Sequence, residues 1–256
     1  MYGTSSARGC RNGWLSGSRN SQLSTVLAVA ELAIALDKGP MREALALVDA
    51  IGDAAQWYKV GPVLCVAEGA AVIRELRARG KRVFLDLKWH DIPNTVARAV
   101  ALAGEVGASL ATVHLAGGTR MLEAAVRARS GDLRLVGVGV LTSLDARQYS
   151  EAVGRPVTDI EEEQRRLVRF GVQVGLDGYV SAAPEAAAVR AVAGARALIV
   201  VPGIRRTGDE TGDQARTATP GEAARAGADL LVVGRPVTAA ADPRREAEAI
   251  ASEALA

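Results

Sequence analysis

Short apolar runs alternate with segments of helical spacing from about residue 31 to the C-terminus. The apolar runs have the length of strands, and in the segments between them apolar residues recur every three or four positions. The predicted strands cover 31–36, 56–60, 82–87, 109–113, 134–140, 177–180, 197–201 and 229–233. The predicted helices cover 40–51, 64–79, 94–106, 119–129, 159–174, 184–193, 219–226 and 243–254.

This strict alternation predicts an α/β protein with a parallel sheet, because parallel strands are joined through helices. Eight such units in about 225 residues are typical of a single (β/α)8 TIM barrel. A doubly wound open sheet is the alternative, but no GxGxxG follows the first strand and no Walker A motif occurs. No linker rich in Pro, Gly or Ser divides the chain. We therefore predict one barrel domain over residues 31–256 and a disordered extension over residues 1–30.

The N-terminal extension changes how the net charge is interpreted. The 256-residue chain has 31 Lys and Arg against 29 Asp and Glu, which gives a formal net charge of +2. Residues 1–30 hold three arginines and no acid, so the predicted barrel has 28 basic and 29 acidic residues and a net charge of −1. The mild basicity therefore gives no support for a nucleic-acid partner.

The sequence predicts a cytoplasmic protein. No run of 18 apolar residues is present, so we expect no transmembrane helix. Basic residues followed by an apolar run at 26–36 resemble a secretory signal, but Glu31 interrupts the run and no clear cleavage site follows it. We expect Cys10 and Cys65 to be free thiols, with a disulfide as the alternative.

Charged residues fall where the first three predicted strands end. Asp37 follows the first strand, Lys59 ends the second, and Asp86 and Lys88 end the third, with Asp91 in the next turn. The active site of a (β/α)8 barrel forms at this end, and Asp86 and Lys88, two positions apart, should share one strand face. An ordinary buried ion-pair network is the alternative, but such networks add little stability, so the cluster favours a function.

The last two predicted strands are followed by candidate anion-binding turns. Backbone N–H groups at Gly203 and Gly234 can approach an anion, Arg235 can bind it bidentately, and Gln214 can donate through its amide. Each turn alone could be structural, but barrels often bind phosphate after strands seven and eight. With only two histidines in the chain, a metal site with several histidines is excluded. We expect an enzyme for a small phosphorylated substrate that uses a lysine as acid, with no metal or cofactor.

The string LDLKWHDIPNT at 85–95 closely resembles the orotidine 5′-phosphate decarboxylase family. The resemblance runs from about residue 31 to the C-terminus. It includes ALD (35–37), KVG (59–61), VHLAGG (113–118), VLTS (140–143), PGIR (202–205), GDQ (212–214) and GADLLVVGRP (227–236). It implies a carbon-carbon lyase that converts orotidine 5′-monophosphate to uridine 5′-monophosphate without a cofactor, the last step of de novo UMP synthesis.

The resemblance also implies roles for individual residues. Lys88 would be the proton donor, Asp86 would lie against the departing carboxylate, and Lys59 and Asp91 would complete a charged tetrad. Asp91 and Thr95 would reach across the interface of a homodimer into the partner's site. The implied substrate-binding residues are Asp37 and Lys59 for the ribose, Thr142 and Ser143 near the base, and Arg205, Gln214, Gly234 and Arg235 for the phosphate. Pro202 and, in the partner's site, Thr95 are also expected to contact the substrate. The segment 203–213 is a candidate lid.

Two other functions fit the same scaffold. A metal-dependent sugar-phosphate decarboxylase or aldolase would share DxKxxD, but the IPNT continuation argues against it. A non-catalytic nucleotide-binding barrel would not need the intact set of Asp86, Lys88 and Asp91.

Overall fold

Eight parallel strands close into a barrel in a computed structural model that describes residues 30–37, 39–206 and 216–255. The strands follow one another in sequence order, and the last pairs with the first, as the (β/α)8 prediction requires. They are β1 (Glu31–Ala35), β2 (Trp57–Val60), β3 (Arg82–Trp89), β4 (Leu110–His114), β5 (Arg134–Val138), β6 (Gly178–Val180), β7 (Leu198–Val201) and β8 (Leu230–Val233). Apart from Ala30, the expected N-terminal extension lies outside the described residues.

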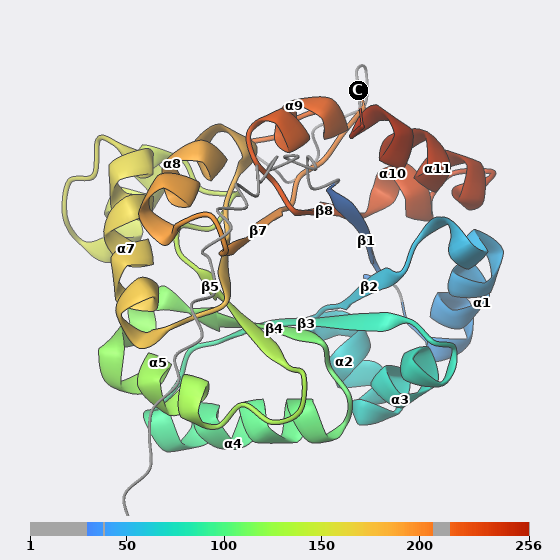
Figure 1. Ribbon diagram of the computed structural model, residues 1–256, viewed down its shortest axis with the longest axis horizontal. Helices are drawn as coiled ribbons and strands as arrows, with labels where there is room; N and C mark the ends of the chain where they lie inside the picture. Colours follow the sequence, from blue (N-terminus) through green and yellow to red (C-terminus); the bar gives the residue numbers. More distant parts are fainter. Residues whose placement is uncertain (1–29, 38, 207–215, 256) are drawn as a thin grey trace, which may run out of the picture.

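The helices form an outer ring around the strands (Figure 1). They are α1 (Met41–Ile51), α2 (Pro62–Glu68), α3 (Ala70–Ala78), α4 (Pro93–Glu105), α5 (Gly118–Arg127), α6 (Ala146–Val153), α7 (Ile160–Val174), α8 (Ala183–Ala193), α9 (Pro220–Arg225), α10 (Arg235–Thr238) and α11 (Pro243–Glu253). Single 3₁₀ turns occupy Gly52–Ala54 and Leu115–Gly117. No described helix has the length and apolar character needed to cross a membrane.

Two details of the predicted helices are wrong. The helix expected over 64–79 is two helices, because Gly69 between them has a φ of 58° and a ψ of −143°, which breaks the helical path. Two helices were also missed: α10 has only four residues, and α6 buries only Tyr149 over its eight residues. The start of α6 is specified by a capping box between Asp145 and Gln148.

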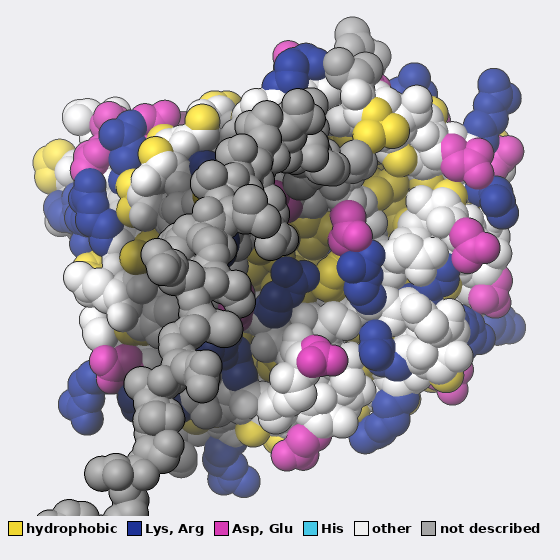
Figure 2. Space-filling view, viewed as in Figure 1, with side chains coloured by type: hydrophobic (Ala, Val, Ile, Leu, Met, Phe, Trp, Pro, Cys, Tyr) yellow, Lys and Arg dark blue, Asp and Glu magenta, His cyan; other side chains and the backbone are white. Residues whose placement is uncertain are grey.

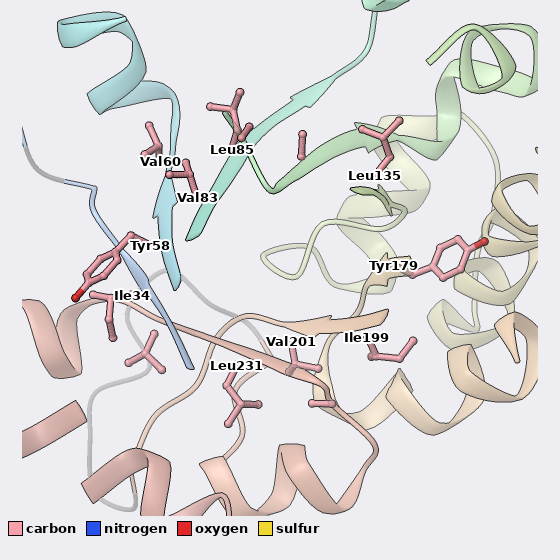
Figure 3. Close-up of a cluster of buried hydrophobic side chains, with 14 of the residues drawn as sticks. Ile34, Tyr58, Val60, Val83, Leu85, Leu135, Tyr179, Ile199, Val201 and Leu231 are labelled. Carbon is pink, nitrogen blue, oxygen red and sulfur yellow. The ribbon is translucent and has the colours of Figure 1, made fainter. Parts of the chain in front are cut away.

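Apolar side chains fill two layers, one inside the barrel and one between the strands and the helices. Alternate residues of each strand point to opposite faces, so neighbouring positions supply the two layers. Figure 3 shows the outer layer, in which Ile34, Tyr58, Val60, Val83, Leu85, Leu135, Tyr179, Ile199, Val201 and Leu231 point away from the barrel axis. The inner layer consists of Ala33, Ala35, Trp57, Phe84, Leu110, Val136, Val200, Leu230 and Val232. On the face shown in Figure 2, acidic and basic side chains are interspersed.

The same carboxylate arrangement occurs at the amino ends of β6 and β8. Asp177 accepts hydrogen bonds from Arg129 (2.5 Å) and from the backbone N–H of Leu135 on the neighbouring strand (2.8 Å). Asp229 likewise accepts from Arg190 (2.6 Å) and from the N–H of Ile199 (2.7 Å). Each aspartate therefore ties a strand, its neighbour and an outer arginine together at the end of the barrel opposite the carboxyl ends of the strands.

We expect Asp229→Asn to lower the free energy of unfolding by about 1–3 kcal/mol, because it removes the charge from two hydrogen bonds. Urea unfolding at pH 7 measures the change. Asp132→Asn, at an exposed position, is the matched control and should unfold like the parent chain. Equal stability of the two variants would show that the aspartate at β8 does not stabilise the barrel end.

Candidate active site

A cavity of about 430 Å³ opens at the carboxyl ends of the strands. Its floor is apolar and is formed by strand residues that include Phe84, Val138 and Val200. Its wall carries most of the site residues that the sequence singled out, namely Asp37, Lys59, Asp86, Lys88, Thr142, Ser143, Pro202, Gly203, Arg205, Gly234 and Arg235. An apolar cavity of this size with a few convergent polar groups is the usual form of a small-molecule site.

Four charged side chains form a row of alternating sign along one wall of the cavity. The ammonium of Lys59 lies 2.8 Å from Asp37 Oδ1 and 3.8 Å from Asp86 Oδ2. The ammonium of Lys88 donates to both oxygens of Asp86, each at 2.9 Å. Lys59 and Asp86 are each only 9% exposed, so this pairing offsets the cost of removing their charges from water.

The backbone at Lys88 departs from a regular strand. Its φ is +48°, and it is the one non-glycine residue with positive φ among the residues that the structure describes. Asp86 and Lys88 both line the cavity from β3, as their spacing predicts, although the strand between them is not regular. The two side chains meet through a local irregularity, since the pairing between β3 and β4 shifts register between Leu85 and Trp89.

The neighbouring wall, at the ends of β7 and β8, has the chemistry of an anion site. Pro202, Gly203 and Arg205 follow β7, while Gly234 and Arg235 follow β8, and all five line the cavity. Because β8 pairs with β1, this wall adjoins the row of charges at Asp37. Glycine backbone and two guanidinium groups suit a phosphate, as the turn sequences predicted. Gln214 and most of the candidate lid 203–213 lie outside the described residues.

The segment after β5, which carries Thr142 and Ser143, is held from both sides. On one side, the Gln164 side chain accepts from the N–H of Val140 (2.9 Å) and donates to the carbonyl of Val180 (3.0 Å). Gly139 makes room for it, since a Cβ there would lie 2.2 Å from Gln164 Oε1. On the other side, Arg216 donates to the carbonyl of Leu141 (3.1 Å) and pairs with the buried Glu185. The cavity wall is therefore supported by hydrogen bonds that start from neighbouring elements.

The buried carboxylate of Glu163, on α7, connects α6 to α7 through hydrogen bonds. Glu163 accepts from Arg166 (2.8 and 3.0 Å), Arg155 (2.7 Å) and the Tyr149 hydroxyl (3.1 Å). The guanidinium of Arg166, together with Arg155 and Tyr149, lowers the pKa of Glu163 from 4.5 to about 2, although burial acts in the opposite direction. The segment 139–145 leads directly into α6, so this network fixes its far end.

Two expected site residues do not line the cavity of their own chain. Asp91 is exposed, and its Oδ1 accepts from the backbone N–H of Ile92 (2.6 Å). Thr95 is also exposed, on the first turn of α4. Both lie beyond the row of charges, at the surface that follows β3.

Thr112 on β4 is a polar residue of the site that the sequence analysis missed. It is fully buried, and its hydroxyl contacts the backbone of Lys88 and the carboxylate of Asp86. A threonine within an apolar strand is common, so the pattern of the sequence carried no signal for it.

His114, at the end of β4, is held as a neutral imidazole. Its Nδ1 accepts from the N–H of Ala116 (3.2 Å), which requires that nitrogen to be unprotonated, and its ring stacks on that of His90 at 5.1 Å. Burial, followed by the nearby His90 and Lys88, lowers the pKa of His114. The ring therefore adds no positive charge beside Lys88 near pH 7.

Cys65, the described cysteine, is a free thiol, whereas Cys10 lies outside the described part of the chain.

A closed (β/α)8 barrel with a charged cavity at the carboxyl ends of its strands is the architecture of a TIM-barrel enzyme. The sequence model of the orotidine 5′-phosphate decarboxylase / HUMPS family matches residues 30–250. The chain therefore belongs to that family.

Individual proteins agree with this assignment. The chain is 48% identical over 223 residues to orotidine 5′-phosphate decarboxylase of Methylobacterium radiotolerans, across 87% of this chain and 95% of that protein. It is 52% identical over 194 residues to the protein of the same name in Anaeromyxobacter sp. (strain K), across 76% and 85%. The crystal structure of orotidine 5′-phosphate decarboxylase from Lactobacillus acidophilus is similar with a TM-score of 0.78 and 30% identity, covering 89% of this chain and 100% of that one.

The network at Glu163 predicts a specific dependence of stability on pH. Because the folded-state pKa is lowered, its contribution is fully present above about pH 4.5 and is lost as the pH falls toward about 2. We expect Glu163→Gln to lower the free energy of unfolding at pH 6 and to flatten its decline between pH 4.5 and 2.

Urea unfolding at a series of pH values measures both effects. Glu151→Gln removes an exposed carboxylate from a pair with Arg147 on α6, and it should leave the pH profile of the parent. An unchanged acid slope in Glu163→Gln would contradict the prediction.

Proposed function

We propose that this protein decarboxylates orotidine 5′-monophosphate to uridine 5′-monophosphate and CO2, the last step of de novo UMP synthesis. The observation that carries the proposal is the ammonium of Lys88, fixed 2.9 Å from both oxygens of Asp86 at a cavity whose wall after β7 and β8 suits phosphate. Membership of the family and the names of its relatives support the reaction. A cytoplasmic location accompanies this biosynthetic role as a prediction.

The substrate would span the cavity from the guanidinium wall to the row of charges. Its phosphate would bind at Arg205, Gly234 and Arg235, with Gln214 and Pro202 contributing there. Its ribose hydroxyls would bind Asp37 and Lys59, whose carboxylate and ammonium can accept and donate, respectively. Its base would lie by Thr142 and Ser143. This orientation brings the substrate carboxylate toward Asp86 and the ring carbon that bears it toward Lys88.

Lys88 would then supply the proton. When the bond to the carboxylate breaks, CO2 leaves and the electron pair stays on the ring carbon, where it is poorly delocalised. A fixed ammonium stabilises that charge as it develops and transfers a proton to the carbon. Lys88 is left as a neutral amine, which water reprotonates. Repulsion between Asp86 and the substrate carboxylate is relieved as CO2 departs.

A homodimer would complete each site. Asp91 and Thr95 are exposed and lie outside the cavity of their own chain, which suits side chains that serve a partner. Two exposed apolar residues accompany them, Ile92 (67% exposed) in the same turn and Leu102 (57% exposed) on α4. Apolar side chains exposed around polar ones are typical of an interface between subunits.

We expect the purified protein to consume orotidine 5′-monophosphate in the presence of EDTA, and we expect Lys88→Ala to lower kcat by about 10³-fold or more. Loss of the orotate absorbance measures the reaction. Lys88→Arg keeps a positive charge but not a usable proton, so it should also be inactive. Calorimetric binding of uridine 5′-monophosphate verifies that the variants are folded. Activity that requires a divalent metal would favour a sugar-phosphate decarboxylase or aldolase instead.

Asp91 allows a direct test of a site shared between subunits. Asp91→Ala and Lys88→Ala should each be nearly inactive alone. Mixing them under conditions that exchange subunits should restore activity, because each mixed dimer has one site with both residues intact. Recovery approaching a quarter of the parent activity is expected from equal amounts with random pairing. No recovery, despite mixed dimers detected by mass spectrometry, would place Asp91 in the site of its own chain.

A further inference from the structure

We propose that Thr112 is a positioning residue for the lysine and the aspartate that carry the proposed decarboxylation. Its hydroxyl bonds to the backbone of Lys88 and to the side chain of Asp86, and so fixes the direction of both groups at the cavity. This role rests on the proposed function, but it concerns a residue to which neither the sequence motifs nor the family resemblance gave a part.

The need for such a residue arises from the path of β3. Leu85 pairs with Ala111 and Trp89 pairs with Val113, so four steps along β3 correspond to two along β4. The additional residues bulge from the ladder, and Lys88 within them takes up a φ of +48°. A residue with a side chain is disfavoured there by about 1–2 kcal/mol, so the surrounding contacts must hold it in place.

Thr112 provides a contact at this bulge. The backbone N–H of Lys88 donates to Thr112 Oγ1 at 2.7 Å, in place of the carbonyl that a regular ladder would offer. Thr112 is fully buried, so water does not replace this acceptor without rearrangement. An N–H group left without a partner in such a place is costly, which ties the conformation of Lys88 to the hydroxyl.

The direction of the hydroxyl proton follows from the same contacts. A backbone N–H can only donate, so Oγ1 accepts from Lys88 and its own proton is free to point elsewhere. Asp86 Oδ1 lies 3.0 Å away and accepts it. Asp86 in turn accepts from the ammonium of Lys88. The result is a closed ring of hydrogen bonds in which one hydroxyl joins the backbone and, through Asp86, the side chain of the same lysine.

The ring predicts a particular effect of removing the hydroxyl. Thr112→Val keeps the shape of the side chain but can neither accept nor donate, so both Lys88 and Asp86 lose a partner. Displacement of a reacting group by about 1 Å can reduce a rate about 10²-fold. We expect kcat to fall about 10- to 100-fold, while the KM for orotidine 5′-monophosphate changes less than about threefold, because the phosphate and ribose contacts lie elsewhere.

Two matched variants separate positioning from general destabilisation. Thr112→Ser restores the hydroxyl without the methyl group and should return kcat to within about threefold of the parent. Val113→Ala creates a cavity at the next, fully buried position of β4, on the face toward the helices. It should lower the midpoint of urea unfolding but leave kcat within twofold of the parent.

The inference is overturned if Thr112→Val retains kcat within twofold, if Thr112→Ser is as impaired as Thr112→Val, or if Val113→Ala loses kcat to the same extent. If Thr112→Val does not fold, Thr112→Ala is compared with Thr112→Ser under the same criteria. A parent chain that fails to decarboxylate orotidine 5′-monophosphate would refute the proposed function itself. A fully active parent with an unimpaired Thr112→Val would refute only the role of Thr112.

Discussion

Eight parallel strands that close on themselves end at the same rim, so side chains from the ends of different strands can face a common space. This constraint lets residues as far apart in sequence as Asp37 and Arg235 line one cavity. The helices outside the barrel and the apolar layer inside it leave this rim as the place where polar groups can converge. Closure of the barrel is therefore the first requirement for the function of the chain, because the individual contacts of the site form only once the strand ends are brought together.

Within the rim, the alternation of charge determines what the cavity can do. Lys59 and Asp86 are nearly buried, and neither would be tolerated alone in that environment. Each is acceptable because a group of opposite sign lies on either side. The row places the ammonium of Lys59 between two carboxylates, and it leaves Lys88, whose side chain is 38% exposed, at the end that faces the cavity. An array of this kind is organised before substrate arrives, so little reorganisation is needed during the reaction.

Most of the fold could be predicted because the periodicity of apolar residues reports directly on the elements. Asp37, Lys59, Asp86 and Lys88 could be assigned to one site because strand ends converge in a barrel. The break at Gly69 could not be predicted, since it depends on a single backbone conformation. The helix α6 was overlooked, although Asp145 and Gln148 have the spacing of a capping box in the sequence. Thr112 was missed for a different reason. The role of Thr112 depends on a register shift between β3 and β4. Register is a property of a strand pair, and neither strand specifies it alone.

Asp177 and Asp229, at the amino ends of β6 and β8, affect which positions of such a barrel can change in sequence without loss of the fold. They anchor the sheet at the end remote from the cavity, and neither is among the described residues that line it. Stability and recognition therefore draw on separate sets of residues. Replacement of rim side chains can alter the ligand accepted while the anchor keeps the strands in place, and a sequence that drifts at one end retains its architecture at the other.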